Sequence, residues 1–398
     1  GFYTRWAFKA IDTTFDLGDT LIGRVIHNGD VPISDSYTET LRARLPAVVP
    51  GDYHVLLRTD IRNQVREANE TNNIGASLDR FDLDVPALTL GTPTNGAFDF
   101  STENLLYRVD LTAGTTVRFA FDSTSLVFGR DGIFDLYLRR GELPTIGEFA
   151  ATLDAPLQTD PELIVSVDQT GTYFLLIVPD TVNDSTFSLL AETIPFGIRS
   201  VTTDTIGNAG ISTLKIQGSQ FTSDTEFSLV KGGGVSVPGT IVQLKDRTTA
   251  YVSFLMNEEP LGLYTVRAED DGEVTTLTDA VTLQSGEAEH VVVFGAGGAQ
   301  IRKGRPARVG VEYGNIGDED TAAPLIRIVA STGNQFGFDA DDYIQGIPLH
   351  ALGAAPDGPL DILRPGLSSS FPIVVEAGED VSLRFESING DDIRPLTA

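Results

Sequence analysis

Residues 58–73 have the sequence RTDIRNQVREANETNN and follow the run YHVLL of residues 53–57, in which the first, third and fifth side chains form one apolar series. Alternation with a period of two predicts a β-strand. The Asn- and Glu-rich stretch behind it predicts a tight turn, because Asn side chains bond the neighbouring backbone and tolerate left-handed conformations. A strand that ends in such a turn is typical of the last hairpin of a small β-sandwich.

The composition extends this prediction to the whole chain of 398 residues. It contains 40 Gly and 20 Pro among abundant Val, Thr, Leu and Phe, which indicates many short strands joined by turns. The length suits two to four domains at roughly 100–200 residues each. The predicted fold class is therefore all-β, a linear array of immunoglobulin-like and jelly-roll-like β-sandwiches.

The charge balance excludes some partners. Lys and Arg total 28 against 56 Asp and Glu, which gives a formal charge of −28. Nucleic acid and anionic lipid both require clustered cations, so we expect neither as a partner. An acidic surface keeps a protein soluble and can also recruit divalent cations, and the composition leaves both roles open.

Cysteine is absent, which removes disulfides, thiolate metal sites and cysteine nucleophiles. No stretch approaches the roughly 18 apolar residues of a membrane span, so we expect no membrane insertion. The N-terminal run GFYTRW lacks the basic-then-apolar order of a signal peptide. We expect the chain to be excised from a longer polypeptide.

The closing turn of the first sandwich carries a family resemblance. Its residues resemble the closing motif of the bacterial CARDB module, an immunoglobulin-like domain related to cell adhesion: Asp60, Asn63, Val65, Glu67, Asn69, Glu70, Asn72 and Asn73. The resemblance implies that residues 1–85 are a CARDB-like domain. Immunoglobulin-like sandwiches need about seven strands, and residues 1–85 provide fewer, so we expect the opening strands to lie upstream of Gly1.

Three further modules are predicted. Residues 104–109, 135–137 and 171–174 resemble the bacterial pre-peptidase C-terminal domain, a jelly-roll-like sandwich found beside secreted enzymes, and imply a module at 86–193. Residues 198–201, 213–221 and 260–266 resemble the IPT/TIG immunoglobulin-like fold with its Gly-x-x-Phe turn, and imply a module at 194–286. The turn GNIGD at 314–318 resembles the Asn-x-Gly turn of CARDB-like repeats, and implies a second CARDB-like module at 287–398 that stops before its closing strands. We call these ranges modules 1 to 4.

A recurrent tyrosine supports this division. Tyr53, Tyr173 and Tyr264 each stand two residues after a Gly at the start of a late strand. A tyrosine there can send its hydroxyl group back to the backbone of the preceding loop, as in the tyrosine corner of Greek-key sandwiches. Module 4 lacks this motif. In module 2, residues 144–153 are expected to hold one helical turn, and in module 1 residues 36–45 are expected to form a strand.

The acidic loops carry the metal hypothesis. Calcium prefers six to eight oxygen ligands, which short Asp-rich loops supply together with backbone carbonyls. Two triads fit this pattern: Asp12, Asp16 and Asp19, and Asp339, Asp341 and Asp342. The Asn- and Glu-rich turn at 67–73 is a third place for Ca²⁺. Solvated turns explain the same residues, so the sequence leaves both interpretations open.

Catalytic signatures are missing from the sequence. The four histidines, His27, His54, His290 and His350, share no metal-ligand spacing, and there is no Gly-x-Ser-x-Gly elbow. The glycine-rich stretches at 231–234 and 295–300 are predicted turns, because neither opens a helix that could hold a phosphate. We therefore predict no catalytic residue and no cofactor site, and a chain that is not an enzyme.

The function that we expect is a non-catalytic, extracellular structural or adhesive scaffold in a giant bacterial cell-surface or matrix protein. The alternative is the accessory, substrate- or carbohydrate-binding region of a secreted hydrolase or peptidase. The expected partners are other surface or matrix proteins or a polysaccharide, and self-association into a filament or layer is a further option. Each of these roles places the chain outside the bacterial cell or on its surface.

Overall fold

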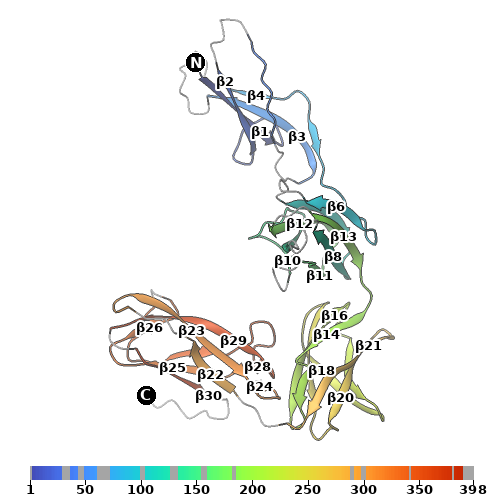
Figure 1. The fold of residues 1–398 in the computed structure, drawn as a ribbon, viewed down its shortest axis with the longest axis vertical. Coiled ribbons are helices and arrows are strands. Elements are labelled where there is room, and N and C mark those ends of the chain that lie inside the picture. The colour runs from blue at the N-terminus through green and yellow to red at the C-terminus, as the bar shows by residue number, and fades with distance from the viewer. Residues whose placement is uncertain are drawn as a thin grey trace. The chain divides into compact units, whose positions relative to one another are not determined.

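The computed structural model describes residues 2–28, 36–43, 49–60, 72–98, 104–125, 133–153, 159–181, 185–286, 291–296, 302–339, 342–378 and 381–388. These residues form strands, turns and irregular segments and no helix, so the predicted all-β class is confirmed (Figure 1). In particular, they hold no helix with the length and apolar character that crossing a membrane requires. The chain divides into two compact units, Gly1–Ala113 with Val117–Thr193, and Gly114–Thr116 with Ile194–Ala398.

The described strands of module 1 are β1 (Phe2–Ala10), β2 (Thr20–Asn28), β3 (Gly51–Thr59), β4 (Ile74–Ala76) and β5 (Phe81–Leu83). They form one sheet in the order β2-β1-β3-β4, with β5 also paired to β3. The core is small. Phe8, Ala10 and Leu56 are buried, and Phe15 packs edge-on against Phe8 with 4.7 Å between ring centroids.

The described strands of module 2 are β6 (Thr94–Phe98), β7 (Leu105–Leu111), β8 (Thr115–Ser125), β9 (Ile133–Arg140), β10 (Ala151–Thr152), β11 (Glu162–Val167), β12 (Gly171–Thr181) and β13 (Ser185–Thr193). They form two sheets, β10-β9-β12-β7 and β11-β8-β13-β6, around one core. The predicted alternation on β8 is confirmed, since Val117, Phe119 and Phe121 are buried in that core. Arg118 lies between them in sequence and pairs with two glutamates instead.

The described strands of module 3 are β14 (Gly197–Thr202), β15 (Thr205–Gly207), β16 (Ile211–Ser219), β17 (Glu226–Lys231), β18 (Val235–Asp246), β19 (Thr249–Leu255), β20 (Gly262–Asp270) and β21 (Glu273–Gln284). They are paired in the order β14-β16-β19-β18-β17-β20-β21-β15. The Gly-x-x-Phe turn places Phe221 fully inside the core. It also requires Gly218, since a Cβ there would collide with the Phe221 ring and a backbone carbonyl.

The described strands of module 4 are β22 (Val291–Ala296), β23 (Pro306–Asn315), β24 (Thr321–Ala322), β25 (Leu325–Ala330), β26 (Gln335–Gly337), β27 (Leu349–Leu352), β28 (Ile362–Leu363), β29 (Ser368–Glu376) and β30 (Leu383–Ile388). Two sheets, β22-β23-β29-β26 and β27-β25-β30, share one core that includes Val311, Ile328 and Ile373. The short pair β24-β28 lies apart from these sheets in the pairing order.

The three predicted tyrosine corners are confirmed. Tyr173 donates its hydroxyl hydrogen to the carbonyl of Gln169 at 2.8 Å, and Tyr264 donates to Pro260 at 2.9 Å. Tyr53 makes the same bond to the carbonyl four residues before it. Module 4 lacks the motif. There the strand residue Tyr313 donates its hydroxyl hydrogen to the carbonyl of Ala354, 41 residues later, at 2.5 Å.

Two local predictions are wrong. Residues 144–153 form no helical turn, because the Thr145 hydroxyl accepts the amide of Glu148 at 3.0 Å and the two residues close an antiparallel bridge. Residues 36–43 are described and form no strand. They meet β2 through side chains instead, with Tyr37 stacked on His27 at 3.7 Å between ring centroids.

The four buried cores draw on residues 8–56, 88–191, 196–283 and 309–385. Each of these spans lies inside one predicted module. The boundaries at 85/86, 193/194 and 286/287, and the family assigned to each module, stay proposals. Limited proteolysis of the full chain tests the boundaries, since cuts are expected first in exposed connections between cores.

Candidate functional site

Buried polar side chains gather where modules 3 and 4 meet. Ser212, Thr213, Asn315, Thr321 and Arg364 are all buried although each carries a hydrogen-bonding group. Burying a polar group costs free energy unless the group is hydrogen-bonded. A cluster of buried polar side chains therefore indicates a set of specific hydrogen bonds. We call the contacts of residues 203–215, 251, 253 and 284–286 with residues 315–321 and 357–366 junction 3–4.

Asn315 shapes the turn that module 4 presents at this junction. Its side-chain Nδ2 donates to the carbonyls of Glu319 at 2.6 Å and Leu363 at 2.9 Å. Its Oδ1 accepts the amide of Gly317 at 2.9 Å. This Asn-x-Gly turn is the one that the sequence predicted at 314–318. It holds the next three residues, Asp318, Glu319 and Asp320, in a fixed conformation, which we call the acidic turn.

Backbone hydrogen bonds join the acidic turn to module 3. The Gly207 amide donates to the carbonyl of Asp318 at 2.8 Å, and the Asp320 amide donates to the carbonyl of Ile211, also at 2.8 Å. The buried Ser212 hydroxyl donates to the same Asp318 carbonyl at 3.2 Å. The acidic turn is therefore anchored on both β15 and β16 by groups that do not depend on side-chain charge.

The Asp320 carboxylate is held by one residue at both of its oxygens. The Thr213 amide donates to Oδ1 at 2.8 Å and the Thr213 hydroxyl donates to Oδ2 at 2.6 Å. Burial of the carboxyl group raises the pKa of Asp320 to about 6, although the two Thr213 bonds and the charge of Arg364 act to lower it. The neighbouring Glu319 adds to the increase.

Glycines in module 3 make room for the acidic turn. A Cβ at Gly207 would lie 2.6 Å from Oδ1 of Asp318, and a Cβ at Gly286 would lie 2.9 Å from Oε1 of Glu319. A Cβ at Gly210 would collide with the other carboxylate oxygen of Glu319. Real Cβ atoms do not come so close, so a side chain at any of these three positions would require the carboxylates of the acidic turn to shift.

A buried arginine forms the second part of the junction. Arg364 donates from Nη2 to Oδ1 of Asp357 at 3.1 Å, and Lys215 of β16 donates to Oδ2 of Asp357 at 3.1 Å. The Arg364 guanidinium also lies over the ring of Tyr251, 4.9 Å from the centroid. Burial acts to raise the pKa of Asp357, but the Lys215 bond and the positive charges of Lys215, Arg364 and Lys245 outweigh it and lower the pKa.

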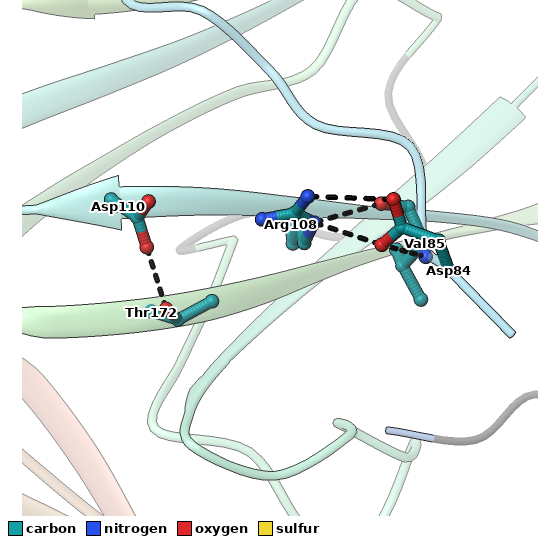
Figure 2. Close-up of polar contacts among 5 residues, drawn as sticks. All are labelled: Asp84, Val85, Arg108, Asp110 and Thr172. Carbon is teal, nitrogen blue, oxygen red and sulfur yellow. Dashed lines mark hydrogen bonds and ion pairs between the residues drawn. The ribbon is translucent and has the colours of Figure 1, made fainter. Parts of the chain in front are cut away.

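A different junction lies at the connection between modules 1 and 2. Figure 2 shows the Arg108 guanidinium on β7 pointing toward Asp84 and the Val85 carbonyl, at 3.2 Å and 3.1 Å from Nε. The Arg108 amide and carbonyl bond Pro86 and Leu88 at 2.9 Å and 2.8 Å. We call these contacts of residues 84–88 with Arg108 junction 1–2. The Asp84 side chain is 56% exposed and the Arg108 side chain 33% exposed, so water competes for this ion pair.

The three carboxylates of the first predicted calcium triad accept hydrogen bonds from backbone amides of their own loop. Asp12 accepts the amide of Thr14 at 2.7 Å, Asp16 accepts the amide of Gly18 at 2.7 Å, and Asp19 accepts the amide of Asp16 at 2.8 Å. Within the described ranges, no three His, Cys, Asp or Glu side chains come together in a way that could hold a metal ion. Such short-range bonds are typical of Asp-rich turns.

The second triad is described in part. Asp339 and Asp342 are exposed, and their backbone folds so closely over Gly337 that a Cβ there would meet the carbonyl oxygens of both. Asp341 lies outside the described residues. Calcium binding by either loop stays a prediction. Thermal unfolding with Ca²⁺ and with a chelator tests it: a higher midpoint with Ca²⁺ supports binding, and equal midpoints remove it.

Most of the CARDB-like closing motif, residues 61–71, lies outside the described residues. Of the rest, Asn73 accepts the Thr59 hydroxyl at 3.0 Å and so ties the end of the hairpin to β3. Two of the described histidines, His54 and His27, contact neighbouring side chains. His54 is buried and accepts Nε of Arg80 at 3.1 Å, and His27 pairs with Glu39 at 3.0 Å. His290 also lies outside the described residues.

Sequence reasoning missed the residues of junction 3–4 other than its turn. Thr213 and Asp320 are separated by more than a hundred residues, and nothing in either stretch indicates the other. The only local signals were Gly207 and Gly210 around a short loop and an acidic triplet directly after the Asn-x-Gly turn. Asp318, Glu319 and Asp320 resemble any other solvated acidic turn until the fold places them.

No protein-family model matches the chain, and no curated protein matches it by sequence. Among solved structures, a pre-peptidase C-terminal domain of a collagenase from Bacillus anthracis is 15% identical, with a TM-score of 0.23, and covers 27% of this chain and 95% of its own. A tetra-tandem repeat from the extending region of a large adhesion protein is 13% identical, with a TM-score of 0.19. The match covers 97% of this chain and 91% of the repeat structure. SGBP-B from a complex xyloglucan utilization locus in Bacteroides uniformis is 11% identical, with a TM-score of 0.18. The match covers 77% of this chain and 99% of the SGBP-B chain. At these scores the similarities carry no conclusion about function.

Proposed function

We propose that this chain is a non-catalytic segment of an extracellular scaffold, in which successive β-sandwiches are held by specific junctions to space or connect other components of a bacterial surface or matrix. The proposal includes the family resemblances of modules 1 to 4 and the surface location. Its expected partners are other surface or matrix proteins or a polysaccharide.

Junction 3–4 is the observation that carries this proposal. A freely jointed chain needs only linkers between its modules. Here the Asp320 carboxylate accepts bonds from Thr213 at both oxygens, and Arg364, which is 3% exposed, lies over the Tyr251 ring. Each of these contacts joins residues more than a hundred positions apart. Buried, hydrogen-bonded polar groups favour one relative arrangement over others, because any other arrangement breaks these bonds. A fixed joint is useful to a spacer and has no evident use in a chain of independent binding modules.

The chemistry of the same junction suits a structural role. The Asp320 carboxylate accepts an amide and a hydroxyl of Thr213, and the Asp357 carboxylate accepts Lys215 and Arg364. The buried His54 likewise contacts the Ser77 carbonyl and the Arg80 side chain. General acid–base catalysis requires a titratable group within reach of a substrate, and none of these contacts provides that access.

Nuclear magnetic resonance on the full chain tests the scaffold proposal. Residual dipolar couplings from modules 3 and 4 are expected to fit one alignment tensor, as they do for a rigid pair. A double variant, Asp320→Ala with Arg364→Met, is expected to require two tensors. Two tensors for the unaltered chain would contradict the proposal.

Two further assays separate the alternative functions. Incubation of the purified chain with protein and polysaccharide substrates is expected to give no turnover, and hydrolysis by the chain alone would overturn the non-catalytic assignment. A glycan array tests the accessory role: saturable binding to one polysaccharide class would favour the accessory region of a secreted hydrolase over a scaffold.

A further inference from the structure

Junction 3–4 closes over a titratable group to which no oppositely charged side chain among the described residues is bonded directly. The Asp320 carboxylate receives a neutral amide and a neutral hydroxyl from Thr213, and the same hydroxyl lies 2.5 Å from Oγ of Ser253. The arginine of the junction bonds Asp357 instead. The negative charge of Asp320 is therefore moved from water into the junction without an ion pair to offset the lost hydration.

The neighbouring charges do not remove this cost. Glu319 stands beside Asp320 on the acidic turn and repels its negative charge, while Arg364 acts on it at longer range and attracts it. The strands of module 3 packed against the carboxylate contribute Thr213 from β16 and Ser253 from β19, neither of which titrates in this range. Lys215 of β16 is bonded to Asp357.

We propose that junction 3–4 is a proton-responsive joint, which is closed more firmly when Asp320 is protonated and opens more readily when Asp320 is ionised. Protonation removes the buried charge and the repulsion from Glu319. The backbone bonds of Gly207 and Asp320 across the junction are independent of that charge and hold the closed form in both states. Opening returns the carboxylate to water.

Linkage gives the direction and the pH window. Burial raises the pKa of Asp320 from 3.8 to about 6, and this burial exists only while the joint is closed. The closed joint therefore binds the proton more tightly than the open one. As the pH rises from about 4 to about 6, the open joint loses its proton first, so the closed population is progressively disfavoured, and above about 6 the effect is complete. The full change in the closed-to-open ratio is on the order of ten-fold to a hundred-fold.

Hydrogen exchange of the full chain measures this ratio. Three amides cross the junction: Gly207 to the Asp318 carbonyl, Asp320 to the Ile211 carbonyl, and Thr213 to the Asp320 carboxylate. Their protection factors, corrected for the intrinsic pH dependence of exchange, are expected to be roughly ten-fold or more higher at pH 4.5 than at pH 7.5. The amide of Val266, inside the β17-β20 ladder of module 3, serves as the internal reference.

Two variants isolate the group responsible. Asp320→Asn keeps an oxygen that can accept from Thr213 and removes the titration, so its Gly207 protection factor is expected to be the same at both pH values. Asp84→Asn alters an acidic residue of junction 1–2 and is expected to keep the full pH response. An unchanged pH response in Asp320→Asn, or a pH-independent ratio in the unaltered chain, would overturn the proposal.

A direct titration keeps the proposal testable if Asp320→Asn does not fold. The ¹³C chemical shift of the Asp320 carboxyl group in the unaltered chain is expected to titrate well above the ordinary range for aspartate, and titration near 3.8 would contradict a proton-responsive joint. The inference concerns the joint itself and does not depend on the scaffold function. A chain that proved to be a carbohydrate-binding accessory would contain the same joint.

Discussion

Junctions 1–2 and 3–4 connect consecutive β-sandwiches in two different ways. In junction 1–2, module 2 binds the connecting segment itself: residues 84–88 lie along β7, and the ion pair of Asp84 with Arg108 is open to water. In junction 3–4, module 3 binds a turn from inside module 4, and two of the bonding residues, Thr213 and Arg364, are buried. The first arrangement fixes where a linker leaves a sandwich. We expect the second one to make the two folds depend on each other.

This difference predicts where substitutions matter. An exposed ion pair contributes little, because both partners are well solvated when it is broken. A buried charged group contributes much more to the difference in free energy between the intact and the broken junction. Water does not reach the partners of such a group to replace the lost contact. The same kind of substitution should therefore have unequal effects in the two junctions, and matched variants measure how unequal they are.

Replacing the arginine of each junction gives the largest expected effect. Arg364→Met removes a guanidinium from between Asp357 and the Tyr251 ring and is expected to lower the free energy of unfolding of modules 3 and 4 by about 3 kcal/mol. Arg108→Met is expected to cost below about 1 kcal/mol in module 2. Urea unfolding followed by pulsed hydrogen exchange and mass spectrometry measures each module through its own peptides. Equal losses in the two variants would mean that burial does not distinguish the junctions.

Thr213→Val is the next test, and its effect depends on pH. The variant removes the hydroxyl that donates to Oδ2 of Asp320 and is expected to cost about 2 kcal/mol at pH 7, where the carboxylate is ionised. The Thr213 bond lowers the pKa of Asp320, so its loss raises that pKa further. Below about pH 5 the carboxyl group is protonated in the folded chain and the cost is expected to shrink. A cost that stays constant from pH 4.5 to pH 7.5 would contradict this account, and Thr145→Val in module 2 is the control for loss of a hydroxyl in an exposed turn.

Filling a glycine of the junction is expected to have a smaller effect. Gly207→Ala places a methyl group 2.6 Å from Oδ1 of Asp318 and requires the acidic turn to move, at an expected cost of about 1–2 kcal/mol. Gly75→Ala is the matched control, because a Cβ on that β4 glycine meets no atom within 4 Å. The same urea experiment measures both. A stability loss in Gly75→Ala as large as that in Gly207→Ala would show that lost backbone freedom, rather than the fit at the junction, sets the cost.

The sequence predicted what depends on local order and missed what depends on assembly. Tyr173 and Tyr264 each donate to the carbonyl four residues earlier, so five consecutive residues of the sequence contain both partners of each corner. The Asn315 turn is equally local. Asp320 and Thr213 lie in different modules, more than a hundred residues apart, and an acidic triplet by itself does not indicate whether water or a neighbouring module will surround it. The prediction of a helical turn at 144–153 was wrong for a local reason. The Thr145 hydroxyl accepts the Glu148 amide and so stabilises a non-helical turn.

Asp84→Asn is the smallest expected effect and the strictest test of the comparison. The substitution removes the charge that faces Arg108 but keeps a side-chain oxygen that can accept the Val85 amide, which Asp84 now accepts at 2.8 Å. We expect a loss below about 0.5 kcal/mol at low salt, falling to none at high salt, because an exposed pair is screened by mobile ions. Urea unfolding of module 2 at two ionic strengths measures this. A loss above about 1 kcal/mol that persists in salt would show that junction 1–2 also behaves as a buried contact, and the distinction between a held linker and two interdependent sandwiches would no longer stand.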